Sequence, residues 1–158
     1  PCMRSPLAAA TIAFAALVSF PAPVLAADDA RPALKLQSPA DAVPRPTDEA
    51  LRSAMTTLRD TVGARLQGDP AQPMAEADYV ALAAEVERQL AGIVAGRDFH
   101  SRAGRHLQWL LGDIADGAGL MRTAPRVPGK RMGLLRVVET LNFYGREYDH
   151  PGWAALKP

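Results

Sequence analysis

The chain has 158 residues, of which 48% are apolar and 22% are charged, and its formal charge is +1. This balance excludes a polytopic membrane protein and a disordered tail, and the length suits one packed domain. The near-neutral charge also removes the electrostatic argument for nucleic-acid binding. Only 6% of the residues are aromatic, and the apolar residues favour helices over strands.

The first 26 residues have the pattern of an export signal. Arg4 precedes an uncharged, mainly apolar run over 7–20, and Val24 and Ala26 occupy the positions that signal peptidase reads. The run is shorter than a membrane-spanning helix, and Pro21 follows it. We therefore predict a signal peptide over 1–26, cleavage after Ala26, and a periplasmic protein that keeps no membrane span. An uncleaved anchor is the alternative.

Removal of the signal changes the composition of the remaining chain. It takes away Cys2, the single cysteine, and Arg4, so the mature protein has a formal charge of zero. A chain without cysteine has no disulfide scaffold, no thiol nucleophile and no Cys-ligated zinc. It also cannot attach a c-type haem through CxxCH. Together with the Ala- and Arg-rich composition, the signal indicates a bacterial periplasmic protein.

Prolines divide the rest of the chain. Residues 27–46 contain four prolines and no apolar periodicity, which predicts a flexible, Pro-rich arm. Beyond it, prolines occur only outside the stretches in which apolar residues recur at helical spacing. These stretches predict helices over about 48–66, 75–95, 102–122 and 130–148. Thr47 is the expected cap of the first helix and Ser101 that of the third.

Each predicted helix carries one apolar stripe. The stripes consist of Leu51, Met55, Leu58, Val62 and Leu66; Tyr79, Leu82, Val86, Leu90, Ile93 and Val94; Leu107, Leu110, Leu111, Ile114, Ala118 and Met121; and Leu134, Leu135, Val138, Leu141, Gly145 and Tyr148. Short connections make neighbouring helices antiparallel. We predict an all-α, up-down-up-down four-helix bundle over 47–153, with a tail over 154–158. A three-helix bundle with one loose helix is the alternative.

The third predicted helix is unusually rich in glycine. Gly104, Gly112, Gly117 and Gly119 lie in or near it, and each interior glycine costs ~1 kcal/mol relative to alanine. A helix tolerates this cost where another backbone or a ligand must come close. The pattern therefore predicts either close helix packing, or a kink or bound ligand beside 111–121.

One set of polar residues could bind a metal ion. His106 and Asp113 share a helix face, and Asp116 lies one turn further on the same side. With an acid of the fourth helix, they could form a site inside a bundle. No ExxH motif supports this site, and the alternative is a hydrated polar face paired with arginines such as Arg136.

Other chemistry has less support. Methionines can ligate copper(I) or haem, but Met55 and Met121 lie on apolar stripes, where core packing explains them. The chain has no nucleophile elbow, phosphate loop or dinucleotide fingerprint. We therefore predict a non-enzymatic protein without a cofactor. An enzyme using Asp113, Asp116 or His106 as acid or base is the least favoured hypothesis.

The predicted fourth helix ends in a distinctive segment. Pro151 stops the helix, Gly152 permits a turn, and Trp153 can fold back over the bundle end, near the start of the second helix or the end of the third. His150 follows the negative helix terminus, which favours its charged form. The alternative function of this segment is a partner surface. That surface would consist of Tyr144, Tyr148, His150 and Trp153.

Two short motifs carry a resemblance to a known group. Ala77-Asp78-Tyr79 with Leu82-Ala83 and Val86, and the terminal Asp149-His150-Pro151-Gly152-Trp153, resemble small exported proteobacterial proteins, some labelled DnrO-like and associated with denitrification or respiratory gene neighbourhoods. The resemblance implies a periplasmic helical protein and no defined activity. The helix arrangement is also similar to the cytochrome b562 and c′ bundles, but CxxCH and an inward histidine on the fourth helix are missing.

These observations give one favoured function and one alternative. We expect a periplasmic binding or accessory protein whose partner is another protein or a small ligand held by the bundle. The resemblance implies a link to respiration or denitrification. A metal- or haem-binding bundle is the alternative.

Overall fold

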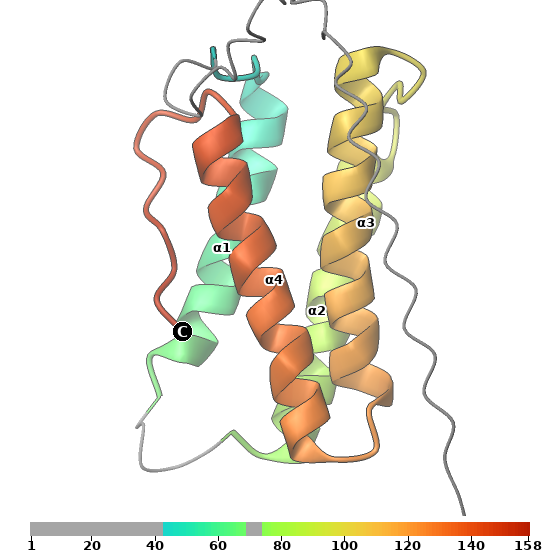
Figure 1. The fold of residues 1–158 in the computed structure, drawn as a ribbon, viewed down its shortest axis with the longest axis vertical. Helices are drawn as coiled ribbons and strands as arrows, with labels where there is room; N and C mark the ends of the chain where they lie inside the picture. Colours follow the sequence, from blue (N-terminus) through green and yellow to red (C-terminus); the bar gives the residue numbers. More distant parts are fainter. Residues whose placement is uncertain (1–42, 69–73) are drawn as a thin grey trace, which may run out of the picture. The chain divides into compact units, whose positions relative to one another are not determined.

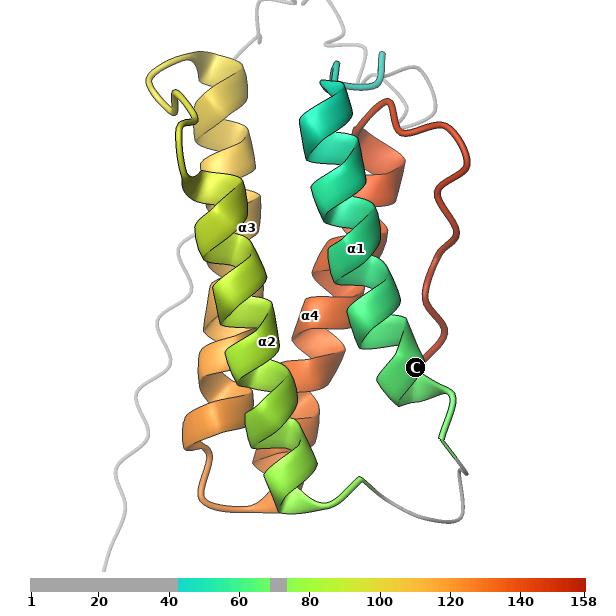
Figure 2. The same cartoon turned by 180° about the vertical axis from the view of Figure 1, so that it is seen from behind.

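The computed structural model describes residues 43–68 and 74–158. The predicted signal peptide, and the predicted arm up to residue 42, lie outside these residues. The described part contains four helices and no strand: α1 (Glu49–Leu66), α2 (Glu76–Val94), α3 (Arg102–Thr123) and α4 (Val127–Glu147). Successive helices run antiparallel and enclose one core (Figures 1 and 2). The predicted all-α four-helix bundle is confirmed. None of the described helices combines the length and apolar character needed to cross a membrane.

The helix ends differ in detail from the prediction. Asp48, not Thr47, caps α1, because its carboxylate accepts the backbone N–H of Leu51 at 2.6 Å. Ser101 caps α3 as predicted, since its hydroxyl accepts from the backbone N–H of Gly104. Helix α4 begins at Val127, three residues earlier than predicted. Pro128 lies in its first turn, where a missing N–H breaks no helical hydrogen bond.

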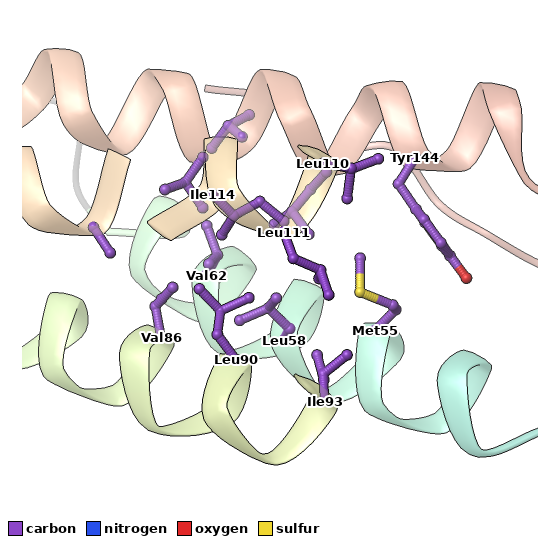
Figure 3. Close-up of a cluster of buried hydrophobic side chains, with 14 of the residues drawn as sticks. Met55, Leu58, Val62, Val86, Leu90, Ile93, Leu110, Leu111, Ile114 and Tyr144 are labelled. Atoms are coloured by element: carbon purple, nitrogen blue, oxygen red, sulfur yellow. The ribbon is translucent and has the colours of Figure 1, made fainter. Parts of the chain in front are cut away.

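The predicted apolar stripes form the core. The stripe of α3 is buried along its full length, and Leu51, Met55, Leu58 and Val62 of α1 are buried opposite it. Three residues outside the predicted stripes, Ala83, Val137 and Tyr144, are also fully buried, whereas Val94 is 45% exposed. The close-up in Figure 3 shows leucines and isoleucines from α1, α2 and α3 meeting at the centre. Tyr144 reaches from α4 toward α1 beside Met55.

Helices α3 and α4 approach each other most closely at two glycines. A Cβ atom placed on Gly133 would lie 2.5 Å from the carbonyl oxygen of Gly117. One placed on Gly117 would lie 2.9 Å from the carbonyl oxygen of Gly133. The two backbones are therefore in direct contact, which requires residues without side chains. Close helix packing explains Gly117, one of the four glycines that the sequence singled out.

A buried lysine closes the end of α3. Lys130 is 2% exposed, and its Nζ donates to the carbonyls of Met121 and Arg122 at 3.2 and 3.1 Å. The carboxylate of Glu76, at the start of α2, lies 3.6 Å from the same nitrogen. Lys130 thus satisfies carbonyl groups that have no partner within α3. The sequence pattern gave no sign of this role.

The chain after α4 does not cover the bundle end. Residues 148–156, which we call the C-terminal strap, run back along α4 and α1 (Figures 1 and 2). Leu156 exchanges two hydrogen bonds with the Asn142 side chain, at 2.8 and 2.9 Å, and a Cβ on Gly63 of α1 would touch its side chain. The predicted tail is therefore held in place at Leu156. At its other end the strap forms a short parallel bridge with Arg45, the last part of the predicted arm.

Candidate functional site

The strap begins with a tight turn that directs Trp153 toward α4. The backbone N–H of Trp153 donates to the carbonyl of His150 at 3.2 Å, across Pro151 and Gly152. Gly152 has a φ of +80°, and proline followed by a left-handed glycine is the pattern of a type II turn. A Cβ on Gly145 would overlap the indole ring. Trp153 therefore packs directly on α4 at Gly145, and not near the start of α2 or the end of α3 as the sequence suggested.

An aromatic cluster surrounds this contact. The rings of Tyr144 and His150 each lie edge-on to Trp153, with centroids 4.9 Å away. His150 joins the strap to two helices: its Nδ1 lies 3.0 Å from the Tyr144 hydroxyl of α4, and its Nε2 lies 3.2 Å from the Thr56 hydroxyl of α1. The Arg59 guanidinium lies 5.2 Å from the centre of the indole. The cluster fastens the strap to α1 and α4.

The second histidine of interest also has a tyrosine partner. Nδ1 of His106 lies 2.8 Å from the hydroxyl of Tyr148, and Tyr148 stacks on Tyr144 at 4.8 Å. Trp109 and Phe143 lie on the outer side of His106, at 5.9 and 6.3 Å between ring centroids. Nδ1 of His106 is thus hydrogen-bonded to the residue that directly follows α4.

Both histidines are shifted toward the neutral form. Burial lowers the pKa of His150, and the nearby Arg59 and Arg52 lower it further, against a smaller opposing effect of Glu49. The expectation from the helix terminus has the wrong direction for this pKa, because burial and two arginines of α1 lower it. A neutral imidazole has one donor and one acceptor nitrogen, which suits its two hydroxyl partners. Burial likewise lowers the pKa of His106.

The predicted metal ligands are engaged in other contacts. The carboxylate of Asp113 accepts from Arg136 and from the Thr140 hydroxyl, and Asp116 lies 3.3 Å from the same arginine. The hydrogen bond from Arg136 is the main cause that lowers the pKa of Asp113. The structure therefore brings Asp113 and Asp116 together around Arg136 but leaves His106 with Tyr148. Within residues 43–68 and 74–158, no three His, Cys, Asp or Glu side chains form a group that could hold a metal ion.

The predicted partner surface is mostly interior. Tyr144 is completely buried and Tyr148 is 5% exposed, while His150 and Trp153 are half-buried against the same cluster. These four residues attach the strap and present little surface to another molecule. A further candidate site lies between α2 and α3, and sequence reasoning had pointed only to its α3 side, around 111–121.

A hollow of about 440 Å³ opens between α2 and α3. It is lined by Glu87, Leu90, Ala91, Val94, Phe99, Gln108, Leu111, Gly112 and Ala115, and we call it the α2–α3 groove. Leu90 and Leu111 are 6% and 3% exposed and form its floor. The short residues Ala91, Gly112 and Ala115 leave the space above them open. The polar groups of the lining are Glu87 and Gln108, and Glu87 accepts a hydrogen bond from Arg122 at 3.1 Å.

Gly112, one of the four glycines noted in the third predicted helix, lines the groove. A Cβ on Gly112 would meet no atom within 4 Å, so no packing contact within the described fold requires glycine there. Glycine in a helix interior nevertheless costs ~1 kcal/mol relative to alanine. The lack of a side chain at this position keeps the groove open. This favours, for Gly112, the ligand interpretation that the sequence left open for this helix.

No family model, curated protein or solved structure matches the chain.

Proposed function

We propose that this protein is a non-enzymatic binding protein that holds a small apolar ligand in the α2–α3 groove. The observation that carries the proposal is an apolar hollow of about 440 Å³, kept open by a helix-interior glycine that meets no atom within 4 Å. This volume lies within the usual range of small-molecule sites, roughly 300–1,000 Å³. Burial of apolar ligand surface would supply the affinity, at about 25 cal/mol per Å².

The lining also defines the polarity of the ligand. Glu87 is the single ionisable side chain in the lining, and Arg122 balances its charge. A charged ligand would therefore find no unpaired opposite charge in the groove. Gln108 is left to hydrogen-bond one polar group. The groove suits an uncharged, mainly apolar molecule with a single hydroxyl, carbonyl or amide.

The second part of the proposal is export to the periplasm. Its support is the pattern of residues 1–26, in which an apolar run precedes small residues at a cleavage position. After expression of the full chain in a bacterium, N-terminal sequencing of the protein in the periplasmic fraction should begin at Ala27. A protein that stays in the cytoplasm with residues 1–26 attached would contradict export. A link to respiration or denitrification rests on the resemblance to the DnrO-like proteins alone.

A larger side chain at Gly112, which would occupy the α2–α3 groove, tests whether the groove binds a ligand. The uncharged dye N-phenylnaphthylamine should gain fluorescence on binding the protein, and Gly112→Leu should weaken that binding at least about tenfold, by placing four carbons in the hollow. The same change should leave the protein as stable or more stable, because leucine is the better helix former by up to ~1 kcal/mol. Binding is measured by dye titration and stability by thermal melting.

Gly119→Leu is the matched control. Gly119 lies two turns further along α3, also meets no atom within 4 Å, and does not line the groove. It should bind the dye like the unsubstituted protein. Equal binding by both leucine variants would place the dye elsewhere, and a protein that does not bind the dye at all would overturn the proposal.

The metal- or haem-binding alternative has no comparable support. In the described residues, His106 and His150 are hydrogen-bonded to tyrosines, and Met55 and Met121 are packed in the core.

A further inference from the structure

One titratable side chain of the C-terminal strap contacts two helices at once. The ring nitrogens of His150 lie within hydrogen-bond distance of the Tyr144 hydroxyl of α4 and the Thr56 hydroxyl of α1, at 3.0 and 3.2 Å. The ring of Trp153, the largest side chain of the strap, lies against the same imidazole, with centroids 4.9 Å apart. A change in the charge of His150 therefore acts on α1, α4 and the indole together.

The buried hydroxyl of Tyr144 determines which nitrogen of His150 carries the proton. Tyr144 is completely buried, and among residues 43–68 and 74–158 its hydroxyl has no hydrogen-bond partner besides His150. A buried hydroxyl proton without an acceptor is unfavourable, so the Tyr144 O–H donates to Nδ1 of His150. The proton of the neutral imidazole then lies on Nε2, which donates to the Thr56 hydroxyl.

Protonation of His150 is incompatible with this arrangement. An imidazolium donates from both of its nitrogens and accepts at neither. Nδ1 would then direct a hydrogen at the Tyr144 hydroxyl, and the proton of that hydroxyl would lose its acceptor in the interior. When the imidazole moves away from α1 and α4, water can take the place of the lost acceptor. Protonation therefore favours departure of the strap.

The charged groups of α1 act in the same direction. Arg52 and Arg59 both disfavour a positive imidazole, and the opposing effect of Glu49 is smaller. Both arginines already have acidic partners on their own helix, since Arg52 donates to Glu49 and Arg59 donates to Asp60. A second cation at His150 would therefore lie beside two arginines whose nearest acids are already hydrogen-bonded.

Neither α4 nor the strap supplies an anionic partner for the imidazole. Tyr144 stays neutral, because burial raises the pKa of its hydroxyl. The last carbonyl of α4, that of Glu147, accepts from the backbone N–H of Arg45 at 2.8 Å and not from His150. Asp149 precedes His150 in the strap, but its side chain is exposed and has no hydrogen bond to the imidazole.

We propose that the C-terminal strap is a pH-sensitive switch, which is bound to α1 and α4 while His150 is neutral and detaches when His150 is protonated. Release uncovers the surface where Trp153 packs on Gly145 and Leu156 on Gly63. Because the bound strap disfavours the proton, binding is strongest above the ordinary histidine pKa of about 6.5 and weakens as the pH falls below it. Each unit by which binding of the strap lowers that pKa makes release of the protonated strap about tenfold more favourable.

Hydrogen exchange measures how often the strap opens, because the Leu156 amide is bonded to the Asn142 side chain only when the strap is bound. Between about pH 7.5 and about pH 5, the protection factor of this amide should fall about fivefold or more. It should also stay at least about tenfold below that of Ile114, a completely buried residue of α3 that exchanges through larger openings. Protection that does not fall with pH, or that equals the protection of Ile114, would overturn the proposal.

Substitution separates the effects of the three histidines of the chain. The double variant His100→Gln, His106→Gln leaves His150 as the single histidine and should keep the fall in protection. His150→Gln should abolish it, because glutamine offers one donor and one acceptor without titrating near neutral pH. If His150→Gln releases the strap at both pH values, the double variant still decides the question. A fall that persists in His150→Gln, or that disappears from the double variant, would contradict the proposal.

Discussion

Gly133→Ala is expected to destabilise the bundle, although alanine is the better helix former. The new methyl carbon would lie 2.5 Å from the Gly117 carbonyl oxygen and 2.7 Å from the backbone nitrogen of Met121. Both atoms belong to the α3 backbone, which cannot rotate away as a side chain can. Overpacking costs about 1–3 kcal/mol or more, against a gain of ~1 kcal/mol in helix propensity. We expect a net loss of about 2 kcal/mol, measured by urea denaturation, and a Tm lower by about 10 °C.

Gly119→Ala is the matched control for this change. It makes the same substitution on α3, at a position where a Cβ meets no atom within 4 Å. It should raise the free energy of unfolding by up to ~1 kcal/mol. The two glycine-to-alanine changes should therefore have opposite signs. Equal increases in Tm would show that α3 and α4 do not touch at Gly133.

The fold could be predicted because its information is local. Each helix needs only its own apolar stripe and its own end signals, and the stripe of α3 from Leu107 to Met121 is buried as predicted. The errors occur where two local rules compete. A proline can end a helix or occupy its first turn. We placed Pro128 before the fourth helix, whereas in the structure it lies in the first turn of α4.

The candidate sites depend on contacts that the sequence does not display. The sequence identified Gly117 and Gly112 as unusual. It did not show that Gly133 lies opposite Gly117, or that an open groove lies beside Gly112. His150 shows the same limit. The local rule of the helix terminus predicted a charged imidazole, whereas burial and arginines of α1, more than ninety positions away in the sequence, lower the pKa of His150.

The C-terminal strap has the same non-local origin. Pro151 and Gly152 predicted the turn, and the turn is present. The residues that Trp153 contacts could not be predicted from that segment. They include Gly145 on α4 and Arg59 on α1. Turn chemistry sets where the chain reverses, and tertiary packing sets what it then contacts.

Trp153→Ala is expected to loosen the strap and lower the stability of the whole bundle. The indole contacts Gly145, the rings of Tyr144 and His150, and the guanidinium of Arg59. Replacement of a buried tryptophan by alanine costs about 3–5 kcal/mol, and Trp153 is half-buried. We expect a loss of about 3 kcal/mol and a Tm lower by more than about 10 °C, measured by thermal melting.

Two further variants establish whether this loss comes from the predicted contact. Trp109→Ala removes the other tryptophan, which is 58% exposed, and should change the Tm by only a few degrees. Gly145→Val should displace the indole and destabilise the protein about as much as Trp153→Ala. If the two residues act through one contact, the double variant should be little worse than either single variant, since the same interaction cannot be lost twice. Fully additive losses, or an unchanged Tm in Trp153→Ala, would show that the indole does not pack on α4.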